Sequence, residues 1–268
     1  MKSGVKRTTP YKAISIIILV ILAILFLFPL YWIVTGAFKP TTDIYASQPV
    51  WWPSEWVTSN FEKLFTKRSA PLFEIGALVG PTVPAAIRWL VNTVFMSVAA
   101  MLLTCITAAM AGYALAKKRF VGRALLFSLI ICAMALPKQV ILIPLLKEMS
   151  ALKLYGSLWA VIFPTVGWPF GVFLMKQFCE GVPGEMLEAA RIDGASEART
   201  FTQIVVPLIK PGIGALAIFT FINSWNDYFM QLVMLPNSAN FTISLGIATL
   251  QGESSVDTGL LMSGAALA

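Results

Sequence analysis

Few residues in this chain are of types that could carry out catalysis or bind a metal. The sequence contains no histidine, which excludes a histidine general base, a Ser-His-Asp triad and histidine metal ligands. Its three cysteines, Cys105, Cys132 and Cys179, are widely spaced and form neither a CxxC pair nor a disulfide framework. We therefore expect no catalytic residue, no metal site and no cofactor bound by this chain itself.

The chemically informative residues are instead two charged side chains within long apolar stretches, Lys138 and Asp227. A charged residue at the bilayer centre costs about 2.5–3.5 kcal/mol, so each needs a physical reason. Asp227 lies 17 residues after Lys210, roughly 25 Å along a helix. It is therefore either interfacial or, with Asn223 and Asn226, part of a substrate path or a packing surface. Lys138 follows a helix-breaking proline and either extends to the membrane surface or faces a pore, where it would attract an anionic solute.

The composition indicates a membrane protein, whose helices must position these residues. Hydrophobic residues make up 57% of the chain and charged residues only 12%, whereas a soluble domain carries about 25% charged residues. About 20 apolar residues cross a bilayer core of roughly 30 Å as a helix. By this criterion we predict five complete spans and the start of a sixth: residues 13–35, 89–116, 124–146 (broken at Pro137), 156–175, 211–235 and 259–268.

The basic residues predict the orientation, because Lys and Arg are enriched in short cytoplasmic loops. Twelve of the twenty basic residues fall in the segments 1–12, 117–123 and 176–210. We therefore expect these segments, with the N-terminus, in the cytoplasm. The external segments are then 36–88, 147–155 and 236–258. The tryptophans expected at the outer membrane–water interface are Trp51, Trp52, Trp56 and Trp89. The net charge of +7 follows from this asymmetry, and no basic stripe with interleaved aromatic residues indicates a nucleic-acid partner.

The segment 176–210 is more polar than its surroundings and is predicted to form two short helices. Pro183-Gly184 opens the first helix, and Gly194 ends it as a C′ glycine. Ser196 is the expected N-cap of the second. The second helix would carry one apolar stripe, made of Ala198, Phe201, Val205 and Leu208. Such a pair of helices either contacts a cytoplasmic partner or lies on the lipid headgroups.

The same segment carries a recognisable motif. Glu188-Ala189-Ala190 is followed by Gly194, Ile204 and Pro207, a spacing that resembles the EAA loop of permeases of bacterial ATP-binding-cassette (ABC) importers. Val206 stands where that pattern has leucine. The fuller string from Glu188 to Ser196, with Trp225-Asn226-Asp227, resembles the carbohydrate-uptake branch, of the type of the second maltose-transporter permease.

The resemblance implies an all-α, polytopic type I ABC importer permease fold, with a permease core at residues 89–268. It also implies that the first helix of the 176–210 segment docks into a cleft of an ATPase subunit, where small residues let it seat closely. The residues to which it assigns this coupling are Glu185, Glu188, Ala189, Ala190, Arg191, Asp193, Gly194, Ala195, Ser196 and Pro207. Members of the family continue through a sixth helix, so the stretch 259–268 is expected to begin one.

The resemblance further implies an assembly in the bacterial cytoplasmic (inner) membrane. Its partners would be a second, related permease, two ABC ATPase subunits and an extracytoplasmic sugar-binding protein. ATP and Mg²⁺ would be bound by the ATPase subunits, since this chain has no GxxxxGK[ST] phosphate loop. The chain would supply half of an alternating-access pore, with Lys138, Asn223, Asn226 and Asp227 as candidate residues of the substrate path. A pore-facing Lys138 would attract an anionic sugar such as a uronate.

Three alternatives remain open. An importer for amino acids or metals also carries an EAA loop. A membrane channel or binding protein without ATP coupling would need no ATPase partner. A membrane-embedded enzyme is disfavoured, because it needs converging catalytic groups that this sequence lacks.

Overall fold

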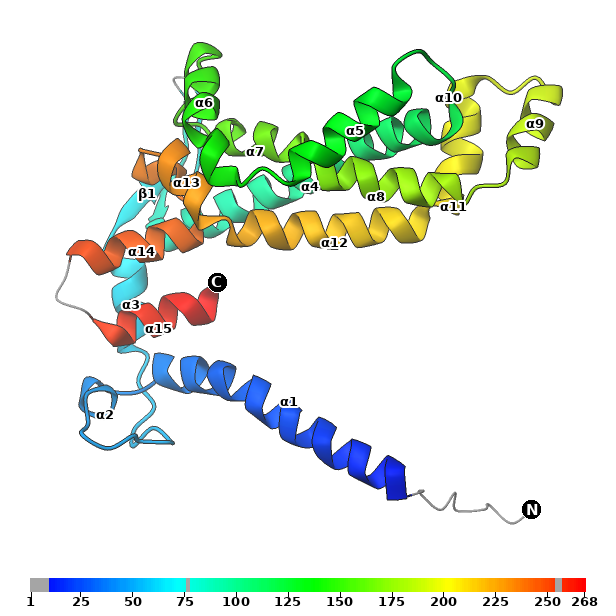
Figure 1. Ribbon diagram of the computed structural model, residues 1–268. Helices are drawn as coiled ribbons and strands as arrows, with labels where there is room; N and C mark the ends of the chain where they lie inside the picture. The colour runs from blue at the N-terminus through cyan, green and yellow to red at the C-terminus, as the bar shows by residue number, and fades with distance from the viewer. Residues whose placement is uncertain (1–9, 76–77, 254–256) are drawn as a thin grey trace. The chain divides into compact units, whose positions relative to one another are not determined.

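The computed structural model describes residues 10–75, 78–253 and 257–268, which are mostly helical (Figure 1). Contacts divide the chain into two compact units, one of Met1–Ala86 with Ile247–Ala268 and one of Ile87–Gly246. Most of the segment expected at 1–12 lies outside the described residues, as do residues 76–77 and 254–256 of the two long external segments. The first unit thus combines both ends of the sequence, and the second is continuous.

The first unit is built on α1 (Pro10–Ala37), whose apolar side chains are exposed over most of its length. α15 (Thr258–Leu267) packs against α1 and α3 (Ser59–Thr66). The Asn60 amide of α3 donates hydrogen bonds to the backbone oxygens of residues 37 and 39, at 3.0 and 2.9 Å. These bonds attach α3 to the C-terminal end of α1.

The segment 36–88, expected as an external connection, contains regular structure of its own. Besides α2 (Thr41–Ile44) and α3 it forms two short antiparallel pairs, β1 (Ser69–Pro71) with β4 (Thr82–Pro84) and β2 (Glu74–Ile75) with β3 (Leu78–Val79). The all-α expectation describes the chain as a whole and misses these strands. Strands of two or three residues are too short to show the alternation by which sequence reveals them.

The second unit consists of helices joined by short turns, and α4 and α14 continue beyond its boundaries. Its helices are α4 (Ala85–Lys117), α5 (Arg123–Met134), α6 (Lys138–Ala151), α7 (Trp159–Val166), α8 (Pro169–Glu180), α9 (Gly184–Ile192), α10 (Glu197–Thr200), the π-helix η1 (Phe201–Val205), α11 (Val206–Leu208), α12 (Lys210–Asn226), α13 (Tyr228–Met234), the 3₁₀-helix η2 (Ser238–Asn240) and α14 (Ile243–Glu253). The expected external segment 236–258 therefore also contains helices, η2 and α14.

The core of the second unit lies where α4, α8 and α12 run side by side (Figure 1). Small residues permit the close approach, as is usual between membrane helices. A Cβ at Gly171 of α8 would meet Ala108 of α4 and Leu216 of α12 at 3.4 and 3.3 Å. A Cβ at Gly112 of α4 would meet backbone atoms of α8 at 2.7 Å.

Trp89, expected at the membrane interface, is instead buried at the start of α4. Its indole N–H donates to the Ser238 oxygen at 3.0 Å, and a Cβ at Gly246 would lie 2.1 Å from its ring. The expectation for Trp89 is therefore wrong, because its ring is buried and the Ser238 backbone oxygen accepts its indole N–H. Trp51, Trp52 and Trp56 are exposed, as an interfacial role requires.

Among the described residues, three helices are long and apolar enough to cross a membrane: Tyr11–Ala37, Ala85–Lys117 and Trp159–Glu180. Two more candidates are bent pairs, Arg123–Met134 with Lys138–Ala151 (108°) and Glu197–Leu208 with Lys210–Asn226 (77°). The count reaches the predicted five only if each bent pair is one span.

Two expected spans differ from the structure. The stretch 124–146 turns by 108° at Pro137, and α5 has only 12 residues, about 18 Å of helix. The stretch 211–235 is two helices, because α12 ends at Asn226 and Asp227 caps α13. The Asp227 carboxylate accepts the Met230 N–H at 3.2 Å. Aspartate is favoured at an N-cap, where it competes with continuation of the preceding helix.

Candidate functional site

α9 is the first of the two helices predicted in the segment 176–210, and it begins at Gly184 as expected. Leu187 and Ala190 are buried against the rest of the second unit. The exposed side chains of α9 and its C-cap are Glu185, Met186, Glu188, Ala189, Arg191, Ile192 and Asp193. Ile192 is 87% exposed, unusually high for an isoleucine. Ala190 therefore serves packing within this chain, and of the two alanines only Ala189 is presented outward.

The C-terminal end of α9 is fixed by a Schellman motif. The Ala195 N–H donates to the Ala190 oxygen (2.9 Å), and the Gly194 N–H donates to the Arg191 oxygen (3.1 Å). Gly194 has a φ of +74°, a left-handed conformation that glycine adopts without steric cost. The predicted helix end at Gly194 is confirmed.

The second helix begins as predicted and then departs from regular geometry. The Ser196 hydroxyl accepts the Arg199 N–H at 3.3 Å, which confirms the N-cap. The next turn, η1, is π-helical and therefore takes more residues per turn than an α-helix. This turn interrupts the helical spacing on which the predicted apolar stripe depends: Phe201 is half-buried and Val205 is buried, whereas Ala198 and Leu208 are exposed, as is Pro207. The buried residues are Thr200, Val205 and Ile209.

Glu197, at the start of α10, joins this segment to the C-terminal end of α4. Its carboxylate forms an ion pair with Lys118, accepts the Tyr113 hydroxyl at 3.2 Å and lies 3.8 Å from the Arg191 guanidinium. The hydrogen bond from Lys118 is the largest cause of a lowered pKa at Glu197. We call these four residues the Glu197 cluster. Sequence reasoning named Arg191 but missed the other three, because their partners are distant in the chain.

Lys117 holds the turn before α9. Its ammonium donates to the backbone oxygens of Val182 (2.7 Å) and Glu180 (3.1 Å), between α8 and α9. Leu187 of α9 belongs to the same hydrophobic cluster as Met175 of α8 and Leu216 of α12. The base of α9 is thus attached to the three central helices, while its outer face is exposed and, of its side chains, Arg191 forms the ion pair with Glu197.

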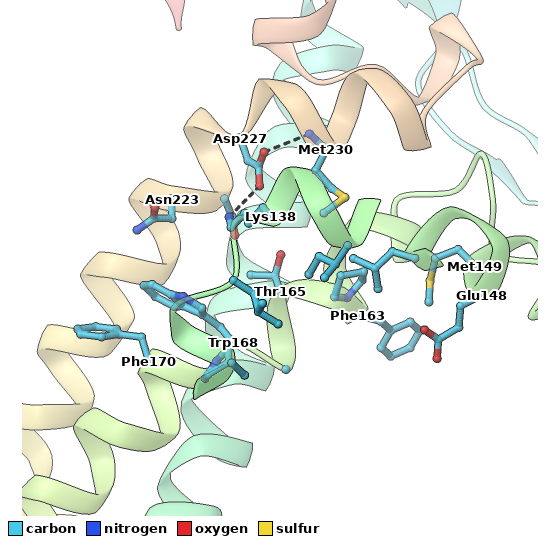
Figure 2. A pocket seen from close by; sticks show the side chains of 18 of the residues that line it. Lys138, Glu148, Met149, Phe163, Thr165, Trp168, Phe170, Asn223, Asp227 and Met230 are labelled. Atoms are coloured by element: carbon cyan, nitrogen blue, oxygen red, sulfur yellow. Dashed lines mark hydrogen bonds and ion pairs between the residues drawn. The ribbon is translucent and has the colours of Figure 1, made fainter. Parts of the chain in front are cut away.

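A second candidate site is a pocket of about 870 Å³ within the second unit, lined by residues of α5 to α8, α12 and α13 and of the turns between them (Figure 2). Lys138 and Asp227 form an ion pair at 3.2 Å on its wall. The Lys138 side chain is 56% exposed and that of Asp227 is 15% exposed. Glu148 lies beside Phe163 in Figure 2, apart from the pair. The two charged residues selected from sequence are therefore brought together, 89 residues apart in the chain.

Of the two asparagines expected in the substrate path, one lines the pocket and the other does not. Asn223 lines the pocket. Asn226 is not among the lining residues, and its amide donates to the Ile222 oxygen at 2.9 Å. Sequence reasoning missed the aromatic lining, Phe163, Trp168 and Phe170, because aromatic residues are common in apolar helices. In the described ranges no group of three or more Cys, Asp or Glu residues could hold a metal ion.

The family model described as "Binding-protein-dependent transport system inner membrane component" matches residues 104–268. The chain belongs to this family. The matched region of the permease contains both α9 and the Lys138–Asp227 pocket.

Named relatives agree with this membership. The arabinooligosaccharide transport permease of Halalkalibacterium halodurans is 32% identical over 92% of this chain and 84% of its own length. The corresponding permease of Bacillus subtilis is 30% identical over 96% and 87%. A solved bacterial ABC transporter involved in import of the acidic polysaccharide alginate contains a similar chain, with a TM-score of 0.74 at 20% identity over 100% of this chain and 93% of that one. The resemblance to the carbohydrate branch is confirmed, and the last comparison supports the permease fold alone.

Proposed function

We propose that this permease is one of two transmembrane subunits of an ATP-driven oligosaccharide importer in the bacterial cytoplasmic membrane. It would assemble with a second, related permease, two ABC ATPase subunits and an extracytoplasmic sugar-binding protein. ATP and Mg²⁺ would be bound by the ATPase subunits, because the sequence carries no phosphate loop. The names of the arabinooligosaccharide permeases support the substrate class.

The observation that carries this proposal is the exposed face of α9. Its apolar Ile192 and its carboxylates Glu185 and Glu188 are presented outward from a helix whose base is buried through Leu187. Met186 of the same helix is also exposed, and a surface that combines large apolar side chains with charged ones is of the kind that a partner covers. We infer that this face docks on an ATPase subunit that presents basic and apolar groups.

We propose that the Glu197 cluster transmits motion between α9 and the pore. Glu197 contacts Arg191 at the end of α9 and Lys118 and Tyr113 at the end of α4. Movement of α9 on ATPase closure would therefore displace the end of α4, and the pore would alternate between inward and outward openings. This mechanism requires the segments 117–123 and 176–210, and with them the N-terminus, on the cytoplasmic side.

The test is an acidic substitution on the exposed face, Ile192→Asp, in the complete importer reconstituted with its binding protein. The side chain loses almost no contact within the chain, since it is 87% exposed. We expect ATP hydrolysis stimulated by the loaded binding protein to fall at least tenfold, with the complex less well assembled or uncoupled.

Val121→Asp is the matched control. Val121 is a fully exposed β-branched residue in the turn between α4 and α5, outside the Glu197 cluster. Stimulation should survive in this variant. Full stimulation of ATP hydrolysis in both variants would contradict ATPase docking by α9. It would favour a channel without ATP coupling, or a position of α9 on the lipid headgroups. Coupled transport of amino acids but of no sugar would favour the non-sugar importer.

A further inference from the structure

We propose that the Lys138–Asp227 pair makes the pocket a subsite for neutral sugar rings and excludes acidic sugars, so that Asp227 is a residue that determines charge specificity. The inference rests on the proposed import function and goes beyond it by assigning a sugar contact to this subunit. It also replaces the sequence-based hypothesis that Lys138 attracts a uronate.

The charges of the lining carry the first step. The charged residues that line the pocket are Lys138, Asp227 and Glu148, so the formal charge of the lining is negative by one unit. The Lys138 ammonium lies 3.2 Å from an Asp227 oxygen, and a uronate that approached it would meet that carboxylate at nearly the same distance. The attraction and the repulsion largely cancel, because the Coulomb energy depends on distance in the same way for both.

The remaining hydrogen-bonding capacity suits hydroxyl groups. A lysine ammonium has three N–H donors, and one of them is directed to Asp227. The Asp227 carboxylate accepts from Lys138 and from the Met230 N–H and retains further lone pairs. The pair therefore offers donors and acceptors side by side, which matches sugar hydroxyls, since each both donates and accepts.

The pocket also offers flat apolar surfaces, against which the less polar face of a sugar ring can pack. Trp168 and Phe170 lie with ring centroids 4.9 Å apart, tilted by 39°, and both line the pocket with Phe163 (Figure 2). A pocket that combines aromatic surface with a few fixed polar groups is the usual form of a small-molecule site. The C–H face of a neutral sugar ring fits such a surface.

The occupant we assign is a sugar rather than an apolar helix of the partner permease or a lipid chain. An apolar occupant would remove water from the half-exposed Lys138 ammonium without replacing its hydrogen bonds. Desolvation of that kind is costly even for a paired charge. A hydroxyl-rich occupant supplies the missing bonds.

The experiment is equilibrium dialysis of a labelled neutral arabinotriose and a labelled trigalacturonate against the complete permease–ATPase complex in nanodiscs. The binding protein is omitted because it selects sugars by itself. The wild type should bind the neutral sugar at least about tenfold more tightly than the uronate. Asp227→Asn should tighten uronate binding roughly tenfold, since it leaves the Lys138 charge uncompensated. Lys138→Gln should weaken uronate binding further.

Asp227→Asn retains the helix cap, because asparagine is as good an N-cap as aspartate. The matched control is Asp257→Asn, which removes the carboxylate charge from the Lys63–Asp257 ion pair of similar length (3.0 Å), outside the pocket lining. It should leave both affinities unchanged. An unchanged ratio in Asp227→Asn, or a wild type that prefers the uronate, would overturn the inference.

Absence of binding of both sugars would also overturn it and would indicate that the partner permease fills the pocket. That result leaves the proposed import function intact as long as the loaded binding protein still stimulates ATP hydrolysis. Failure of that stimulation would instead count against the import function. The two proposals therefore fail in different assays.

Discussion

Gly112→Ala should separate two central helices and destabilise the permease. A Cβ at this position would lie 2.7 Å from backbone atoms of Met175 and Lys176 in α8, whereas carbon atoms pack at about 3.5–4.0 Å. The helices must therefore move apart by roughly 1 Å. Because the obstacle is backbone, no rotation of a side chain can relieve it. Overpacking of this kind costs about 1–3 kcal/mol.

Gly214→Ala is the matched control for this substitution. Gly214 is also helical, in α12, and a Cβ there would meet nothing within 4 Å. Alanine favours a helix over glycine by about 1 kcal/mol, and this gain cancels when the two variants are compared. Gly112→Ala should therefore be the less stable by about 1–3 kcal/mol. The assay is thermal unfolding of the assembled complex in nanodiscs, and equal midpoints for the two variants would refute the packing argument.

Three further predictions concern the α9 segment. Glu197→Gln should reduce stimulated ATP hydrolysis several-fold. It should change the free energy of unfolding by less than about 1 kcal/mol, because the ion pairs are largely exposed. Unchanged stimulation would show that Glu197 takes no part in coupling. Since the pKa of Glu197 is lowered by Lys118, its contribution should be complete above its usual pKa of 4.5 and be lost as the pH falls through the lower folded-state value. A pH profile of unfolding tests this, and the Gln variant is expected to lose only the part of the acid dependence that Glu197 contributes. Gly194→Val should lower the stability of the α9 end by about 1–2 kcal/mol, because Gly194 has a φ of +74°, whereas Gly194→Asn should lower it less. Hydrogen exchange of the α9 amides should then be faster in the Val variant. Similar exchange in both variants would exclude backbone strain as the cause.

The helix ends of the α9 segment were predictable because each depends on residues close together in sequence. The Schellman bonds at Gly194 connect residues no more than five apart, and the Ser196 cap reaches Arg199. The apolar stripe of the second helix was not predictable. The π-helical turn at Phe201–Val205 changes the helical period, and no residue type in that stretch predicts such a turn.

In the pocket, too, single residues were predictable from the sequence but their contacts across the fold were not. Lys138 and Asp227 were identifiable one at a time, because a charge in an apolar stretch is conspicuous. Their pairing depends on the 108° turn between α5 and α6 and on the helix break at Asp227. The pairing supports our proposal that Lys138 does not attract anions, since the Asp227 carboxylate lies beside its charge.

The sequence by itself determined the membrane class, which follows from the composition of the chain. It also determined the family motif and the ends of α9, because motif spacing and helix capping depend on residues close together in the sequence. The tertiary structure decided which side chains share an environment. It buried Ala190 and Trp89, exposed Ile192, and joined Glu197 to Lys118. Such pairings are set by helix packing and by bends whose angles no local pattern specifies, so only the folded chain reveals the charge balance of the pocket.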